Sequence, residues 1–118
     1  FYPVGGTISS ASNLVNLPVP AYTKGDVVRE LIESAWIPRL EAFKPEMIFI
    51  SAGFDAHRDD DMSNLSLSTE GYSWIMHRMM ELADEYSGGR LLSVLEGGYA
   101  IQRLPELIRN HLQILLGK

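Results

Sequence analysis

Two apolar runs of the chain each end in glycine followed by residues that could do chemistry. Residues 47–52 lead into Gly53-Phe54-Asp55-Ala56-His57, and residues 91–95 lead into Glu96-Gly97-Gly98-Tyr99. In open parallel sheets, ligands bind in the crevice outside the carboxyl ends of the strands. We therefore expect Asp55 and Tyr99 to contribute to a single site, assembled from two strand ends.

The first of these segments offers a carboxylate and an imidazole, both of which bind zinc. Residues i and i+2 of an extended segment point to the same side, so Asp55 and His57 could hold one metal ion together. Two ligands are fewer than the three that a catalytic zinc takes from its protein. On these residues alone, a loop or capping role for Asp55 stays open.

The second segment offers a glycine pair and a phenol. Gly97 and Gly98 allow the backbone to approach a small ligand, although neither G-x-G-x-x-G nor a G-K-[ST] ending is present. The hydroxyl of Tyr99 could donate a hydrogen bond to developing negative charge. The alternative is an aromatic residue packed beside a turn.

Other polar residues of the chain are expected to have structural roles. Arg58-Asp59-Asp60-Asp61 lacks the spacing of a calcium loop, and we interpret it as a solvated loop. His77 and His111 fall within apolar stripes of helical period and are expected to be packing residues. Ser51 and Ser93 lack a G-x-S-x-G elbow, which disfavours a serine hydrolase.

Composition is that of a folded domain. The 118 residues are 46% hydrophobic and 21% charged, which excludes a disordered chain. A net charge of −5 without a basic cluster argues against nucleic-acid binding. The absence of cysteine excludes disulfides and thiolate ligands. No apolar run approaches the roughly 20 residues that span a bilayer.

The elements that position these residues alternate along the chain. We expect strands at 14–19, 47–52 and 91–95 and helices at 26–43, 68–87 and 101–116, with a kink or restart at Pro38. This order predicts an α/β fold with a parallel sheet, and the continuous apolarity of 47–52 predicts burial on both faces. Because so small a sheet leaves edges to pair, we expect a piece of a larger domain.

The two strand-end segments together resemble a known family. Residues 51–57 are similar to the S-A-G-F-D-A-H segment of the histone deacetylase family, especially its class II and bacterial amidohydrolase-like members, and residues 96–99 are similar to its E-G-G-Y segment. The resemblance covers residues 1–118 as the C-terminal portion of one catalytic domain. It implies an arginase-like, three-layer α/β/α fold and zinc-dependent hydrolysis of acetyl-lysine or a related acetylated amine.

The resemblance also implies roles for individual residues. Asp55 matches the third zinc ligand, Tyr99 matches the tyrosine that hydrogen-bonds the substrate carbonyl, and His57 matches a position that is not a ligand. The family's other zinc ligands and its paired histidines should lie upstream. We therefore expect the 118-residue chain alone to be inactive and not to retain Zn²⁺.

Four further residues match positions that bind substrate. Gly97 and Gly98 match the glycines beside the acetyl pocket, and Tyr2 and Met62 match the wall of the substrate tunnel. The family often reads D-P-L-G where this chain has Asp60-Asp61-Met62-Ser63. This departure leaves the substrate open.

Two alternatives remain: acetylpolyamines or other small amides as substrates, or a stand-alone α/β module that binds a small ligand. The partner is expected to be an acetylated protein or small amine, without nucleic acid or membrane, in the cytoplasm.

Overall fold

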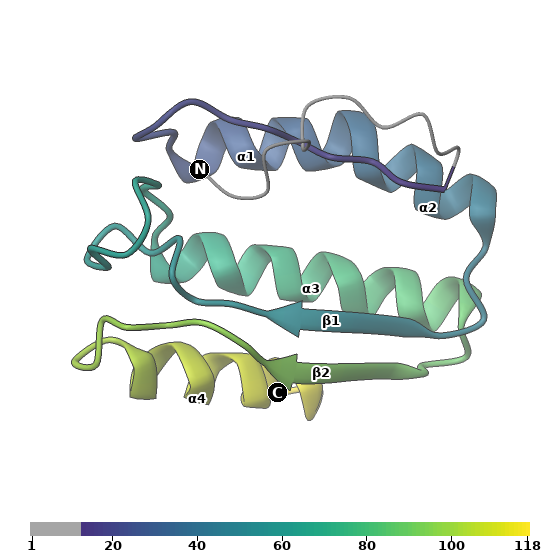
Figure 1. Ribbon diagram of the computed structural model, residues 1–118. Coiled ribbons are helices and arrows are strands. Elements are labelled where there is room, and N and C mark those ends of the chain that lie inside the picture. The colour runs from purple at the N-terminus through teal and green to yellow at the C-terminus, as the bar shows by residue number, and fades with distance from the viewer. Residues whose placement is uncertain (1–12) are drawn as a thin grey trace.

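Two parallel strands and the helices beside them make up the computed structural model, which describes residues 13–118. The chain forms α1 (Gly25–Leu31), η1 (Ile32–Trp36), α2 (Ile37–Phe43), β1 (Ile48–Ala52), α3 (Thr69–Tyr86), β2 (Leu91–Leu95) and α4 (Leu104–Leu115). Figure 1 shows α3 alongside β1, α4 alongside β2, and α1 to α2 on the outer side of α3. The predicted α/β class with a parallel sheet is confirmed.

The sheet brings the two candidate segments to one edge. Ile48 pairs with Leu91 and Ala52 pairs with Leu95, so both strands end at the same level. The ladder continues beyond them, because Glu96 N–H donates to the Ala52 carbonyl at 3.0 Å and Phe54 N–H donates to the Gly97 carbonyl at 2.8 Å. The loops that carry Asp55 and Tyr99 therefore leave the sheet side by side.

The predicted strand at 14–19 is wrong. This segment has no regular structure and lies along α1, η1 and α2 (Figure 1). The Trp36 indole Nε1 of η1 donates to the Val15 carbonyl at 3.2 Å. Pro18 and Pro20 lack the N–H groups that a sheet ladder requires. Among residues 13–118 the sheet therefore has two strands, not the three expected.

The helix predicted at 26–43 continues through Pro38 by changing its winding. A π-helical turn, η1, separates α1 from α2, and Pro38 lies in the first turn of α2. A proline there lacks an N–H and crowds the carbonyl four residues earlier, which the wider turn accommodates. The expected irregularity is therefore a π-helical turn ahead of Pro38 and not a break at it, and the segment ends at Lys44 in a left-handed conformation with φ 52°.

The helices cover one face of the sheet. Ile48 and Ala52 are buried beneath them, whereas the intervening Phe49 is 69% exposed. Burial on both faces was predicted for this strand and is wrong for the described chain, because no helix among residues 13–118 packs on the face that carries Phe49. The main core joins η1 and α2 to β1 and α3, and its buried members are Ile32, Ile37, Ile48, Met79, Leu82 and Ala83.

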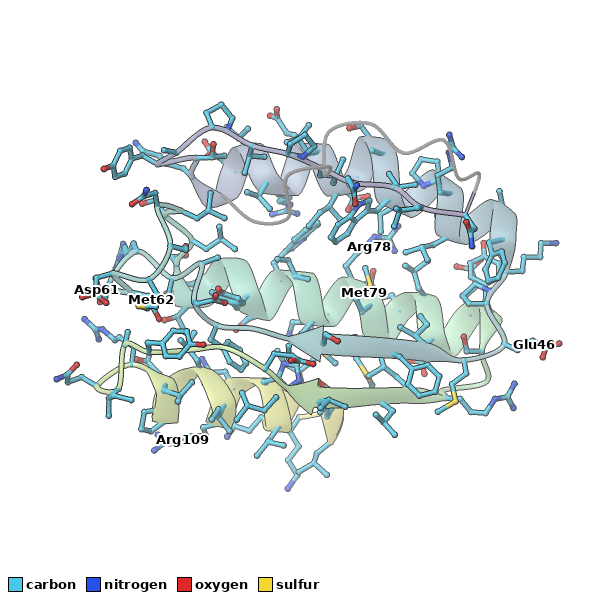
Figure 2. All side chains as sticks on the ribbon, viewed as in Figure 1. Glu46, Asp61, Met62, Arg78, Met79 and Arg109 are labelled. Carbon is cyan, nitrogen blue, oxygen red and sulfur yellow. The ribbon has the colours of Figure 1, made fainter. Side chains whose placement is uncertain are left out.

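Polar contacts hold α3 along the side that faces α2 and at its amino end, and a glycine follows its carboxyl end. Figure 2 shows Arg78 on the side of α3 that faces α2, where its guanidinium lies 3.3 Å from Glu33 and 3.6 Å from Glu41. At the amino end, Ser68 caps the helix, since its Oγ accepts from Gly71 N–H at 3.2 Å. Gly88, with φ 58°, provides a left-handed residue after the helix.

Candidate active site

The carboxylate of Asp55 lies in a cradle made by two glycines. A Cβ atom on Gly53 would approach Asp55 Oδ1 to 2.8 Å, and one on Gly97 would approach its Cγ to 3.0 Å. Asp55 itself is half-buried. The side chain that follows β1 therefore rests against the backbone that follows β2, in space that any larger residue would fill.

This cradle fits one ligand of a metal ion. Carboxylate oxygen is among the donors that zinc accepts, and Asp55 presents it half-exposed at the sheet edge. Among residues 13–118 there is no group of three or more His, Cys, Asp or Glu side chains that could hold a metal. Asp55 can thus supply one ligand, and the remaining ligands would have to come from outside the described residues.

His57 is directed into the loop and not toward a metal. Its side chain is buried, its Nδ1 accepts from Asp59 N–H at 3.1 Å, and its Nε2 lies 3.4 Å from Thr69 Oγ1. The acceptor role of Nδ1 places the proton of the neutral ring on Nε2, facing Thr69. This structural role agrees with the family resemblance, which gives position 57 no metal.

Asp60 is a buried residue of the site that the sequence did not reveal. The prediction of a solvated loop at 58–61 is wrong here, because Asp60 is only 5% exposed. Its Oδ2 accepts from the backbone N–H groups of Tyr99 at 2.6 Å and Ala100 at 3.0 Å, while Oδ1 accepts from Met62 N–H at 2.9 Å. Burial raises the pKa of Asp60, but these three N–H groups together bring it below its usual value.

The neighbours of Asp60 differ in role. Asp59 accepts from Arg103 Nε at 2.7 Å, and this hydrogen bond lowers the pKa of the Asp59 carboxyl. Asp61 is exposed, as predicted for the whole run, and Figure 2 shows it beside Met62 at the end of the molecule where the strands terminate. Consecutive carboxylates of one loop thus bind two points of the segment that follows β2.

The predicted substrate residues lie at different depths. Met62 is exposed on the loop that follows β1, and Tyr99 is 54% exposed. Gly98 has φ 143°, and a Cβ there would lie 2.8 Å from Leu104 and 3.2 Å from Phe54, so its packing demands glycine. Tyr2 lies outside the described residues. The roles predicted for Asp55, Tyr99, Gly97, Gly98 and Met62 stay predictions.

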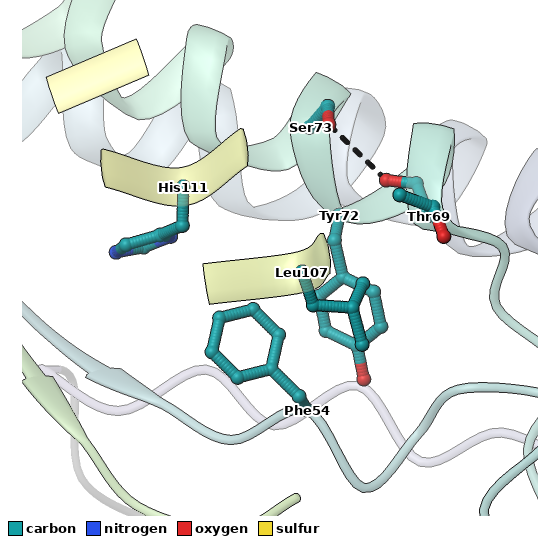
Figure 3. A pocket seen from close by; sticks show the side chains of 6 residues that line it. All are labelled: Phe54, Thr69, Tyr72, Ser73, Leu107 and His111. Atoms are coloured by element: carbon teal, nitrogen blue, oxygen red, sulfur yellow. Dashed lines mark hydrogen bonds between the residues drawn. The ribbon is translucent and has the colours of Figure 1, made fainter. Parts of the chain in front are cut away.

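A layer of rings supports the site from within. Figure 3 shows Phe54 between Tyr72 of α3 and His111 of α4, with ring centroids 5.2 Å and 5.7 Å apart. Burial, with the nearby charge of Asp55, raises the pKa of Tyr72. His111 Nε2 lies 2.8 Å from Ser93 Oγ, and burial lowers the pKa of this imidazole. Both residues serve packing, as the sequence predicted for His111.

The protein is thus a parallel α/β protein. The Asp55 carboxylate and the loop that carries Tyr99 lie at the carboxyl edge of its sheet, where such folds bind ligands. Residues 1–115 match the family model described as "Histone deacetylase domain". The chain belongs to the histone deacetylase family, which confirms the resemblance seen in the sequence.

Individual relatives agree with this assignment. The chain is 40% identical over 107 residues to "Type-2 histone deacetylase 2" of Dictyostelium discoideum, which covers 88% of this chain and 6% of that protein. It is 37% identical over 97 residues to a "Probable deacetylase" of Archaeoglobus fulgidus, covering 82% of this chain and 27% of that protein. The crystal structure of the HDA15 HD domain superposes with a TM-score of 0.80 at 30% identity, covering 88% of this chain and 28% of that chain.

The chain spans less than a third of the length of each of these three proteins. The deacetylase-like fold is confirmed by the superposition. Within residues 13–118, no helix combines the length and apolar composition that crossing a membrane requires.

Proposed function

We propose that this chain is the C-terminal part of the catalytic domain of a zinc-dependent deacetylase that hydrolyses acetyl-lysine or a related acetylated amine. The observation that carries the proposal is the glycine cradle, which holds Asp55 against the backbone leading to Tyr99. Membership in the histone deacetylase family supports the reaction class. In this proposal the other zinc ligands and the general-base histidines belong to the rest of the domain, and "the whole enzyme" below means that complete domain.

Each residue of the site has a definite task in this reaction. Zinc, when bound, polarises the acetyl carbonyl as a Lewis acid. Asp55 holds the metal through its carboxylate, and the hydroxyl of Tyr99 donates to the carbonyl oxygen as negative charge develops on it. One such donor is worth roughly 2.7–4 kcal/mol of transition-state stabilisation. Gly97 and Gly98 would lie beside the acetyl group, and Met62 and Tyr2 are the residues proposed to line its approach.

The substitution Tyr99→Phe in the whole enzyme tests this assignment. It removes one hydroxyl, and we expect kcat to fall by about a hundredfold or more while bound zinc is unchanged. Tyr86→Phe is the matched control, because it makes the same change at the far end of α3 and should leave kcat as in the wild type. Wild-type kcat in Tyr99→Phe would refute the role of this hydroxyl.

The substrate class needs its own experiment. Acetylated peptides and acetylated polyamines would be compared by kcat/KM with the whole enzyme, because Met62, the residue proposed to line the tunnel, is exposed and either kind of amine could pass it. Preference for peptides would support a protein substrate, and preference for polyamines would replace it with a small one. We also propose a cytoplasmic location. The similarity to bacterial proteins such as a "Histone deacetylase-like amidohydrolase" of Pseudomonas aeruginosa supports this proposal.

A further inference from the structure

We infer that Asp60 is a positioning residue that fixes the Tyr99 backbone relative to the loop that carries Asp55; its effect on turnover rests on the proposed deacetylase function. The contacts that carry the inference join residues 39 and 40 positions apart in sequence. One buried carboxylate accepts from the N–H groups of Tyr99 and Ala100 with one oxygen, and from Met62 with the other.

The segment that Asp60 holds has little else to hold it. Gly97 is tied to the sheet through its carbonyl, and the Ala100 carbonyl accepts from Arg103 and Leu104 N–H groups at the start of α4. Between these points lies Gly98, whose φ of 143° only glycine adopts readily. The bonds to Asp60 therefore set the position of Tyr99 between two anchored ends. Hydrogen bonds to an ionised acceptor are about twice as strong as neutral ones, which suits this task.

Asp60→Asn in the whole enzyme is the direct test. Asparagine has nearly the same shape, but one of its two terminal atoms is a donor. Whichever way the amide turns, an NH₂ group faces a backbone N–H that needs an acceptor. We expect kcat to fall by about tenfold to a hundredfold, as for a catalytic group displaced by up to 1 Å, with KM and bound zinc unchanged. Asp61→Asn is the matched control, since it removes the same charge from the exposed neighbour and should leave kcat unaltered.

Two readouts separate positioning from general damage. Hydrogen exchange of the peptide spanning 98–101 should accelerate in Asp60→Asn and not in Asp61→Asn. In a Tyr99→Phe background, Asp60→Asn should lower kcat by less than threefold, because groups that act as a unit are not additive. An equal loss of kcat in both backgrounds would overturn the inference, as would wild-type exchange at 98–101.

The outcome also separates this inference from the deacetylase proposal. A wild-type enzyme that hydrolyses no acetylated substrate refutes the deacetylase proposal, while exchange at 98–101 still decides whether Asp60 holds the loop. If Asp60→Asn does not fold, Asp60→Glu replaces it, because its extra methylene moves the carboxylate away from the three N–H groups, so we expect kcat to fall and exchange at 98–101 to accelerate. Unchanged kcat and unchanged exchange in Asp60→Glu would overturn the inference.

Discussion

The glycine cradle makes a sharp prediction for Gly97→Ala. The substitution adds one methyl group, and its carbon would lie 3.0 Å from both Cγ and Oδ1 of Asp55 and 3.2 Å from Oδ2. All three close contacts are made with one carboxylate. Gly97 shares the extension of the sheet through its carbonyl, so its backbone is less free to retreat than the Asp55 side chain.

The size of the effect follows from these distances. Carbon atoms pack best at about 3.5–4.0 Å, so the Asp55 carboxylate must retreat by about 0.5 Å. Metal–ligand distances tolerate only about 0.2 Å. Displacing a ligand through the residues around it typically costs roughly 10–100-fold in metal affinity. We expect zinc affinity to fall by that factor, or about 1.4–2.7 kcal/mol.

Competition with a chelator of known affinity measures the effect in the whole enzyme. Gly25→Ala is the control, because a Cβ at Gly25 meets no atom within 4 Å and should leave zinc affinity unchanged. In Gly97→Ala we also expect kcat to recover partly at high zinc, since Tyr99 is untouched. Zinc binding as tight as in the wild type would show that Asp55 is not a ligand or that the cradle does not constrain it.

Two predictions concern stability of the same enzyme in urea. Ser68→Ala removes the cap of α3 and should lower the free energy of unfolding by about 1 kcal/mol, whereas Ser51→Ala, at an exposed position of β1, is the comparison; equal effects would contradict the capping role. Because burial lowers the pKa of His111 below 6.5, stability should be fully present above about pH 6.5 and decline as pH falls through the folded-state pKa. His111→Gln should flatten this decline, and an unchanged pH profile would contradict it.

Local patterns were sufficient to predict much of this molecule. The apolar runs predict β1 and β2, and the strand-end rule predicts that Asp55 lies near the segment of Tyr99. These features depend on neighbouring residues or on a rule of topology, so they can be read from the chain. The sequence shows the glycines of the cradle, but it does not show that the Gly97 backbone lies against the Asp55 carboxylate.

The errors share a physical origin in distant contacts. Asp60 lies within a run of acids that is solvated by any local criterion, and its burial depends on N–H donors 39 and 40 residues away. Phe49 belongs to an apolar run, yet its face is exposed because what covers a sheet is decided by other elements. The segment at 14–19 alternates like a strand, but its prolines and the Trp36 side chain direct it onto a helix.

The loop at 60–62 also bears on how such an enzyme could be re-engineered for new amines. Met62 presents its side chain to solvent while its backbone N–H binds Asp60, so a library at this position can vary the rim freely as long as proline is left out. Position 61 can accept proline, because its side chain is exposed and its backbone makes no hydrogen bond with Asp60. The D-P-L-G pattern has its proline at this position. If Met62 lines the substrate tunnel as proposed, substitutions at position 62 should change selectivity, whereas substitutions at position 60 should change turnover.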